Sequence, residues 1–553
     1  MSNTNQEKSS AESDQTKEQQ AHVNRAHHDA TLLSLGSPAL YRLNTERKYV
    51  DGTDEKVRQW TYGRRDGNKQ NKVILMVGEV GSGKTTMINT MINYLLGVKF
   101  EDQEFYRITE EEHQDQPQSQ THEITVYEAF AEENPTSLTI IDTPGYVDTE
   151  ELEKDREFSE YLGRLFSNKD GIRYIDAVCF VVKASKNRLS EKQRYILQSF
   201  LSLFGRDIEN NIVFLLTHSD GRRPTEALNV IKKAKIPCRR YEDKEPVHFL
   251  FNNQQKEKRD KRYPHNLISH WELGDRSMNE FFTLLEPENR ESVQMTLEVL
   301  NERKRLWACV SNLKDRIKES KSKIEELTQI QDALRQIKDK IEKGKNFQFT
   351  VKRNIKEKVS IENEWWWNSY ATCCSVCEEN CHEWKCFVAQ DPSWCSVMKD
   401  DYCKACTGKC HHSKHVRENK KYQSKTVEVI MTFAELKEEN ERTGKLEDID
   451  ETKYRNLYNK HETDMKEFEN KIIIEKTLSI DLEKIKEEKS KLLNEAYDVI
   501  KRLSEITLKV DSTFTRQHLE FLIPELKEEG KDEWIKELED LQKAGEEQRI
   551  KGL

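Results

Sequence analysis

The chain has 553 residues, of which 34% are charged, and its formal net charge is −10. This length is too great for one ordinary hydrophobic core, and so polar a composition is typical of a globular part joined to long solvated helices or to disorder. The acidic balance argues against general nucleic-acid binding by charge, and no apolar run is long enough to span a bilayer or to serve as a signal peptide, so we expect a cytoplasmic protein without a transmembrane segment.

The composition divides the chain into seven parts. Residues 1–35 are rich in Ser, Gln, Glu and Lys and are predicted to be a disordered tail, with a lead-in segment at 36–70. Residues 71–288 alternate strand and helix signals, which predicts an α/β domain with a mostly parallel sheet and helices on both faces. Its apolar strands are expected at 73–77, 138–141, 177–182, 212–216 and 247–251. The remaining parts are a helical arm at 289–345, a Cys-rich β module at 346–435, a second arm at 436–510 and a C-terminal helical segment at 511–553.

A phosphate-binding loop joins the first apolar strand to a helical stretch. Its pattern, G-x-x-x-x-G-K-[ST], is formed by Gly78, Glu79, Val80, Gly81, Ser82, Gly83, Lys84 and Thr85, and Thr86 comes next. The glycines let backbone N–H groups surround phosphates, Lys84 would reach the β- and γ-phosphates, and Thr85 would ligate Mg²⁺. Chance matches to the bare pattern are common, but a match between a buried strand and a helix is rare, and it predicts a P-loop NTPase.

The second motif, D-T-P-G, follows the apolar strand at 138–141. Asp142 can hold Mg²⁺ through water, and the Gly145 N–H can bond the γ-phosphate. Thr121 is the candidate Mg²⁺ ligand of switch I, with Thr125 as the alternative and an ordinary loop threonine as the structural explanation. Together with Lys84 and Thr85, Thr121 completes the set of candidate catalytic residues.

Tyr146 stands where Ras-like enzymes carry the Gln that orients the attacking water. We therefore expect hydrolysis to be slow, or the site to be completed by a second subunit.

A base-reading element follows the strand at 212–216. It consists of Thr217, His218, Ser219 and Asp220, and His218 replaces the Lys that is common in this box. The Asp220 carboxylate can accept hydrogen bonds from guanine N1–H and the 2-amino group, which adenine cannot offer; the alternative is a purely structural Asp in a turn. Asn252 and Asn253, after the last strand, can meet the base with their amides.

The stretch from Asp176 through the Thr217–Asp220 box to Asn253 resembles the immunity-associated GTPases of the GIMAP/AIG family, relatives of septins in the TRAFAC class. The segment 188–193 resembles an extra box of that family. The resemblance covers about 70–285, and it implies a G domain that binds GTP and GDP with Mg²⁺ and dimerises through its switch face. A similar Cys/His-rich insert occurs in large related GTPases of animals and fungi.

Apolar residues recur at helical spacing in both arms, from Leu313 to Ile341 and from Met465 to Leu503. This pattern predicts an antiparallel coiled-coil hairpin, and the alternative is two helices packed onto the GTPase domain. Strand-like alternation at 347–362 and 426–433 suggests that these segments pair and carry the Cys-rich module at the tip of the stalk.

Nine of the twelve cysteines lie between 373 and 410. A repeated C-x-x-C-x-x-x-C-H pattern predicts two four-ligand sites for tetrahedral Zn²⁺, with disulfides or redox and Fe–S chemistry as alternatives. Cys373, His411 and His412 are expected not to take part, and Cys395 is a further candidate for a cysteine that binds no metal. The candidate zinc ligands are Cys374, Cys377, Cys381, His382, Cys386, Cys403, Cys406, Cys410 and His415.

These features predict a GTP/GDP switch or assembly GTPase with slow hydrolysis. Its nucleotide-dependent dimerisation would be coupled to a stalk whose zinc tip binds a protein partner. The alternatives are a septin-like scaffold with little turnover, and an adaptor whose zinc module binds protein or, through basic residues between Lys404 and Lys421, nucleic acid.

Overall fold

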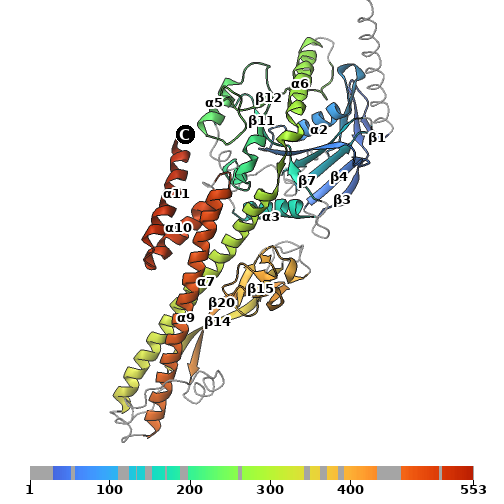
Figure 1. The fold of residues 1–553 in the computed structure, drawn as a ribbon. Coiled ribbons are helices and arrows are strands. Elements are labelled where there is room, and N and C mark those ends of the chain that lie inside the picture. The colour runs from blue at the N-terminus through green and yellow to red at the C-terminus, as the bar shows by residue number, and fades with distance from the viewer. Residues whose placement is uncertain are drawn as a thin grey trace, which may run out of the picture. The chain divides into compact units, whose positions relative to one another are not determined.

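The computed structural model describes residues 29–50, 57–109, 124–132, 134–143, 152–168, 171–186, 188, 197–259, 264–341, 349–361, 370–383, 391–431, 462–509 and 513–551. The chain forms two compact units (Figure 1). Unit 1 takes Met1–Leu300, Leu503–Glu520 and Lys536–Leu553, and unit 2 takes Asn301–Arg502 and Phe521–Ile535. Of the disordered tail predicted at 1–35, residues 1–28 lie outside the described residues, whereas residues 30–34 form a strand, so that end of the prediction is wrong.

Unit 1 is built on an eight-stranded sheet with the order β12-β11-β10-β5-β8-β7-β4-β3. The five strands from β12 to β8 are mutually parallel, as the apolar runs predicted. Their bounds are β5 Gln70–Gly78, β8 Thr136–Asp142, β10 Ala177–Lys183, β11 Ile212–Thr217 and β12 His248–Leu250. β7 (Ile124–Phe130) then runs antiparallel to β8.

Alternate side chains of β5 enter different cores, which explains why the strand is apolar throughout. Ile74 and Met76 pack into the core that α2 (Lys84–Leu95) and α6 (Pro264–Leu284) cover. Val73, Leu75 and Val77 pack into the core covered by α3 (Leu152–Ser167) and α5 (Thr225–Lys233). Helices therefore cover both faces of a mainly parallel sheet, which confirms the predicted α/β class.

The segments before β5 contribute strands that the sequence pattern did not indicate. β4 (Val57–Gly63) lies parallel to β7, and β3 (Glu46–Tyr49) runs antiparallel to β4, so both extend the main sheet. β1 (Ala30–Ser34) and β2 (Ala39–Leu43) form a separate sheet with β6 (Glu104–Arg107). Two short strands, β9 (Tyr174–Ile175) and β13 (Glu291–Ser292), also pair.

Unit 2 is dominated by the two predicted helical arms. They are α7 (Gln294–Ile341) and α9 (Glu462–Ile506), and the division between the units falls within each of them. Three polar contacts between the helices show that the arms are antiparallel. They join Arg305 Nη2 to Glu495 at 2.7 Å, Lys323 Nζ to Asp481 at 3.1 Å, and Gln331 Nε2 to Glu475 at 2.9 Å. Near the far ends, apolar residues of both arms share a core: Leu327, Ile330, Leu334, Phe468, Ile472, Ile474 and Leu478.

A long β-hairpin leaves the far end of the arms. β14 (Phe349–Ser360) pairs antiparallel with β20 (Lys420–Met431) over their full lengths. The hairpin carries a sheet with the order β16-β15-β19 and a small pair of strands. The bounds are β15 Ala371–Cys374, β16 Glu379–His382, β17 Met398–Lys399, β18 Tyr402–Cys403 and β19 His415–Glu418.

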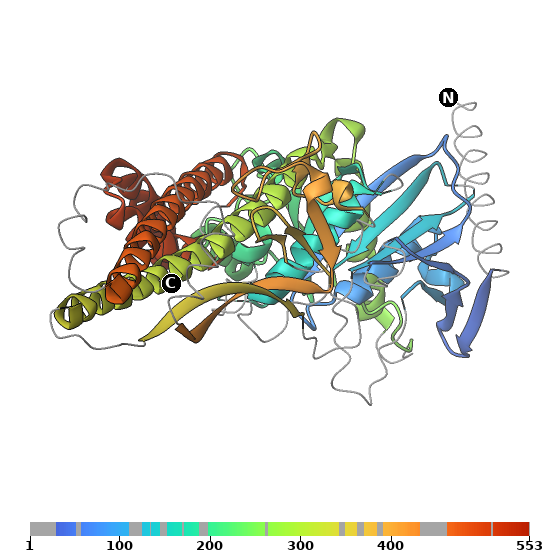
Figure 2. The same cartoon turned by 90° about the horizontal axis from the view of Figure 1, so that it is seen from below.

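The cysteine module does not lie at the tip of the arms, so this part of the prediction is wrong. The hairpin runs back alongside α7 (Figures 1 and 2). Ala308 of α7 belongs to the apolar cluster of the module, and Arg316 donates to the Cys377 carbonyl at 2.9 Å. Ala308 and Arg316 are therefore buried against the module. The helical spacing of apolar residues does not show whether a buried residue of α7 faces the module or the other arm.

Two C-terminal helices follow the second arm, as expected: α10 (Thr513–Glu528) and α11 (Asp532–Lys551). Within unit 2, Trp534 stacks on Tyr497 with ring centroids 4.1 Å apart, and Lys489 pairs with Glu525 at 2.8 Å. Among the helices that the structure describes, none combines the length and the apolar character that a membrane span requires.

Candidate nucleotide and metal sites

The loop between β5 and α2 has the backbone geometry of an anion cradle. Gly81 and Gly83 adopt φ values of 73° and 98°, which favour glycine, and a Cβ at Gly78 would lie 2.7 Å from the Val181 carbonyl oxygen. No side chain caps the N-terminus of α2, and its first turn has no acidic residue. The first N–H groups of the helix can therefore serve an anion such as a phosphate.

Lys84 is positioned across the mouth of this loop. Its side chain is buried, and Nζ donates to the Gly78 carbonyl at 2.7 Å and to the Glu79 carbonyl at 3.3 Å. Ser82 is buried, Thr86 is half-buried, and Val80 and Thr85 are exposed. The ammonium and the exposed Thr85 hydroxyl thus belong to one loop, where the motif would use them on phosphate and Mg²⁺.

Asp142 ends β8 beside this loop. It is in register with Met76 of β5, and the next residue, Thr143, donates its hydroxyl to the Met76 carbonyl at 2.8 Å. Thr125, the alternative switch threonine, lies in β7 opposite Asp142. The predicted Thr121 and Gly145, and also Tyr146, lie outside the described residues.

The base-reading box is hydrogen-bonded to the phosphate loop. Thr217 Oγ1 donates to the Ser82 carbonyl at 2.7 Å, so the end of β11 fixes the turn before Lys84. His218 adopts a φ of 54°, and its Nδ1 lies 3.1 Å from Thr217 Oγ1. The hydrogen bond from Thr217 to Ser82 was not expected from the sequence, because no spacing rule relates residues so far apart in the chain.

Asp220 presents its carboxylate to solvent. Its side chain is 73% exposed, and Oδ1 accepts from the Arg222 N–H at 3.0 Å, as in an Asx turn. This turn is the structural role considered above, and it uses only Oδ1. The other oxygen, Oδ2, lies 3.9 Å from Nε of the exposed Arg222, and a carboxylate oxygen can accept more than one hydrogen bond. Asp220 therefore retains acceptor capacity for a ligand.

Asn252 and Asn253 lie next to this box after β12. Asn252 Nδ2 donates to the Ser219 carbonyl at 2.9 Å, and Asn253 Nδ2 contacts Met87 Sδ at 3.7 Å. The Asn253 Oδ1 is buried and has no hydrogen-bond partner among the described residues. Buried amide oxygens are normally paired, so this acceptor fits a donor supplied by a ligand such as a purine base.

Asp176 holds the phosphate-loop strand from behind. It is fully buried, Oδ2 accepts from the Val73 N–H at 2.6 Å, and Oδ1 accepts from Arg290 Nε at 3.1 Å. Burial raises the pKa of this carboxyl, although the Val73 N–H and the Arg290 guanidinium act in the opposite direction. The role of Asp176 is thus to support β5 and not to touch a ligand.

In unit 2 the structure brings seven of the nine candidate zinc ligands together. Cys374, Cys377, Cys406 and Cys410 form one group, which we call the four-cysteine group. Cys381, Cys403, Cys406 and His415 form the other, which we call the histidine group. In each group the ligand atoms lie within 4.8 Å of one another, and Cys406 belongs to both.

Among the described residues, the remaining candidate ligands and the residues expected not to bind metal belong to neither group. His382 Nδ1 lies 3.2 Å from Cys395 Sγ, and Cys386 is outside the described residues. The Cys373 thiol contacts Asn380 Oδ1 at 3.3 Å, and the ring of His411 packs on that of His412. The sequence repeat predicted two four-ligand sites without assigning ligands to them. In the structure each group combines ligands from the 374–381 segment with ligands from the 403–415 segment.

The ring of His415 has the tautomer that a metal ligand needs. Its Nδ1 lies 3.1 Å from the His411 carbonyl, which can only accept, so Nδ1 carries the proton. Its Nε2 is buried and makes no hydrogen bond within the described part of the chain. A lone pair directed at three thiols in this way is typical of a coordinating histidine.

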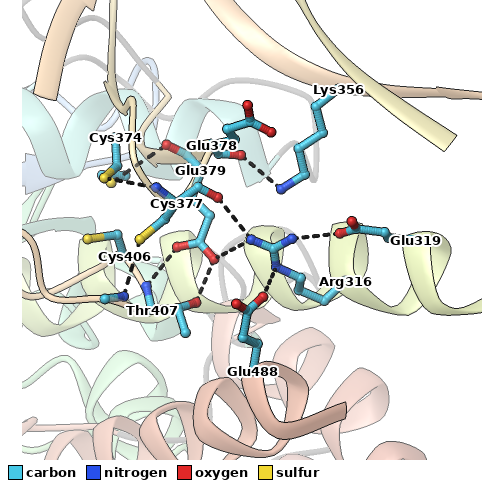
Figure 3. Close-up of polar contacts among 12 residues, drawn as sticks. Arg316, Glu319, Lys356, Cys374, Cys377, Glu378, Glu379, Cys406, Thr407 and Glu488 are labelled. Atoms are coloured by element: carbon cyan, nitrogen blue, oxygen red, sulfur yellow. Dashed lines mark hydrogen bonds and ion pairs between the residues drawn. The ribbon is translucent and has the colours of Figure 1, made fainter. Parts of the chain in front are cut away.

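A buried arginine joins the cysteine module to both arms (Figure 3). Arg316 of α7 forms ion pairs with Glu319 at 2.6 Å, Glu488 of α9 at 3.1 Å and Glu379 of the module at 3.2 Å. Burial by itself lowers the pKa of a guanidinium, but these carboxylates outweigh it and raise the pKa of Arg316. Glu379 in turn accepts from the Thr407 N–H at 2.7 Å, next to Cys406.

Residues 72–283 match the model of the AIG1 family. The comparison with curated proteins gave no match.

Among solved structures, Toc33 from Arabidopsis thaliana in complex with GDP and Mg²⁺ is 15% identical, with a TM-score of 0.28, over 40% of this chain and 87% of Toc33. Toc33 with Mg²⁺ and GMPPNP is 17% identical, with a TM-score of 0.27, over 41% and 88%. LeoA, a bacterial dynamin GTPase from ETEC, is 15% identical, with a TM-score of 0.24, over 49% and 47%.

The family match begins in β5 before the phosphate loop and ends in α6 after the base-reading asparagines, so it spans every described element of the nucleotide site. Over residues 72–283, the chain is therefore similar to the AIG1 family.

Proposed function

We propose that the chain is a guanine-nucleotide switch or assembly GTPase whose unit 1 dimerises in its GTP form and hydrolyses GTP slowly. The observation that carries the proposal is the junction of the phosphate and base loops, where Thr217 bonds Ser82. This hydrogen bond joins the loop that carries the phosphate-binding residues to the box that carries the guanine-binding residues. The buried, unpaired Asn253 Oδ1 and the exposed Asp220 carboxylate supply the acceptors that a guanine edge requires.

The proposed division of roles follows the motifs. The N–H groups from Gly78 to Thr86 hold the phosphates, with Lys84 at the β- and γ-phosphates. Thr85, Thr121 and Asp142 hold Mg²⁺, which neutralises charge on the phosphates. Thr217, His218, Asp220, Asn252 and Asn253 bind the base, while Gly145 bonds the γ-phosphate.

Slow turnover and self-association belong together in this proposal. Tyr146 cannot orient water as a glutamine amide does, so an isolated G domain lacks one part of the usual catalytic set. A second copy that meets the switch face can supply the missing group. Dimerisation through that face is also what the family resemblance implies.

We further propose that the cysteine module of unit 2 is folded around Zn²⁺. Seven cysteine and histidine ligands converge in a segment with little apolar core of its own, and metal binding would supply its folding free energy. The basic residues of the module give little support to nucleic-acid binding, because Lys409 pairs with Glu495, and Lys421 pairs with Glu383 at 3.5 Å.

The test of the nucleotide proposal is a mass measurement on the full chain with GDP and with a non-hydrolysable GTP analogue. We expect a monomer near 65.3 kDa with GDP and about twice that mass with the analogue. The GTPase rate per molecule should rise with protein concentration. A concentration-independent mass and a fast, concentration-independent rate would contradict the proposal, and a stable oligomer in both states without turnover would favour the septin-like scaffold.

The Lys84→Ala variant provides the control for that measurement. It should lose GTP binding and remain a monomer in both conditions, because the β- and γ-phosphates lose their cation. Its zinc content should equal that of the unchanged protein. Loss of zinc in this variant would show that the two sites do not act independently.

A further inference from the structure

We infer that the two ligand groups form one binuclear zinc cluster, in which the Cys406 thiolate bridges the two ions. This inference rests on the zinc part of the proposed function and goes beyond it. Two separate sites need eight ligands, but the described residues offer two groups of four that share one sulfur. Without Cys406, each group retains only three ligands, fewer than a closed structural zinc site uses.

The spacing of the sulfurs fits tetrahedral coordination. A Zn–S bond of about 2.3 Å gives a tetrahedron with edges of about 3.8 Å. Cys377 Sγ and Cys410 Sγ, two corners of the four-cysteine group, lie 3.7 Å apart. Every cysteine of both groups is free, so no disulfide competes for these sulfurs.

Backbone N–H groups point at the sulfurs, as they do in turns that stabilise bound thiolates. Cys403 Sγ accepts from the Ala405 and Cys406 N–H groups, both at 3.4 Å. Cys406 Sγ accepts from the Cys410 N–H at 3.3 Å, and Cys377 Sγ accepts from the Gly408 N–H at 3.3 Å. Such donors stabilise negative charge on sulfur.

Cys406 lies where two turns overlap. It closes the turn that begins at Cys403, in the histidine group, and opens the turn that ends at Cys410, in the four-cysteine group. A single residue that belongs to both turns lies between the two metal positions. No other described ligand is shared.

The position of Cys406 is fixed by its neighbours. The Thr407 N–H and hydroxyl both donate to Glu379, at 2.7 and 2.5 Å, and Arg316 holds Glu379 from the other side (Figure 3). Gly408 must lack a side chain, since a Cβ there would lie 2.9 Å from Cys377 Sγ and 3.1 Å from Cys410 Sγ. The turn therefore closes tightly around the four-cysteine group.

Each ion in this arrangement has four protein ligands, so neither has an open position for a substrate. The cluster is accordingly structural, and its seven side chains join β15, β16, the 403–410 turns and β19 into one unit. The six thiols lose their protons when the two ions bind.

The decisive experiment is cadmium-113 NMR on the full chain after exchange of ¹¹³Cd²⁺ for zinc, with metal content measured on the same sample. We expect two metal ions per chain and two resonances that show scalar coupling to each other, because only a shared ligand atom connects them. The unchanged protein suffices for this result, so it does not depend on whether any variant folds.

Variants then identify the bridge. Cys410→Ala and Cys403→Ala should each keep one ion and lose the coupling, whereas Cys406→Ala should lose both ions. Cys373→Ala is the matched control, because Cys373 is a buried neighbour that belongs to neither group, and it should keep two coupled ions.

The outcomes separate the two proposals. A chain without zinc when purified and unable to bind it would reject zinc altogether. One ion per chain, or two ions whose resonances do not couple, would reject the bridge. Retention of one ion by Cys406→Ala, with two ions in the unchanged protein, would also place Cys406 in a single site.

Discussion

At the scale of single residues, Asp220 offers the most direct test of guanine recognition. The exposed carboxylate has one oxygen in a local turn, and the other lies 3.9 Å from Nε of the exposed Arg222. Asp220→Asn replaces an acceptor-only group with one that presents donors to the N1–H edge of guanine. Since a hydrogen bond to a charged group contributes about 1.5–3 kcal/mol, we expect GTP affinity to fall roughly tenfold to a hundredfold.

Competition binding with GTP, xanthosine and adenosine nucleotides measures this change. The preference for GTP over xanthosine triphosphate should narrow or reverse in Asp220→Asn. Glu226→Gln, which changes an exposed carboxylate nearby in α5, serves as the control and should retain full preference. An unaltered preference in Asp220→Asn would leave the residue with its turn-forming role alone.

At the scale of elements, Arg316 is the residue through which α7, α9 and the cysteine module meet. Its three carboxylate partners come from these three places, and its side chain is 8% exposed. Removing one member of a buried ion network leaves the other charges uncompensated, at a cost of about 3–5 kcal/mol. Arg316→Ala should therefore lower the free energy of unfolding of unit 2 by about that amount.

Urea denaturation followed by helical circular dichroism measures the loss. The matched control is Arg335→Ala on the same helix, because Arg335 is 80% exposed and pairs with Asp332 one turn away. Exposed pairs of this kind contribute about 0–1 kcal/mol, so its midpoint should barely move. Equal losses in the two variants would show that the Arg316 network does not join the module to the arms.

The sequence predicted those elements whose pattern is local. The apolar runs identified β5, β8, β10, β11 and β12, and the helical spacing identified both arms. β4 was missed because it shows no apolar run: Val57, Gln59 and Tyr62 are buried, while Arg58, Trp60 and Thr61 between them are half-buried. Its place in the sheet comes from pairing with β7, which no local pattern reports.

The candidate sites show the same limit. The phosphate loop was predicted in full, since its motif lies within a single turn. The bond from Thr217 to Ser82 and the sharing of Cys406 were not predicted, because both depend on which distant segments meet. The pairing of β14 with β20 was expected, but the direction in which the hairpin runs depends on buried contacts at Ala308 and Arg316.

At the scale of the whole molecule, the two units should respond to different ligands. GTP binds unit 1 in this proposal, and a ligand present at a hundred times its dissociation constant stabilises its unit by about 2.7 kcal/mol. Metal removal by a strong chelator acts on unit 2, whose cysteine module depends on zinc. Differential scanning calorimetry should therefore show one transition that shifts with GTP and another that shifts with the chelator.

The binding of a fluorescent GTP analogue provides the second readout. Its affinity should be unchanged after zinc is removed, and excess zinc should restore the chelated transition. A chain that loses nucleotide affinity together with its zinc would contradict the independence of the two sites.

The full-length pairing of β14 with β20 has a consequence for chain entropy. Phe349 lies opposite Met431, so the segment from 349 to 431 begins and ends at neighbouring residues. The entropic cost of closing a loop grows with the logarithm of its length, at about 0.6 kcal/mol per doubling. Because the strand pairing already holds the two ends together, the length of the segment between them adds almost nothing to the cost of bringing the arms together. Insertions or deletions beyond the hairpin can therefore change the size of the carried module without changing the distance that the chain must bridge between α7 and α9.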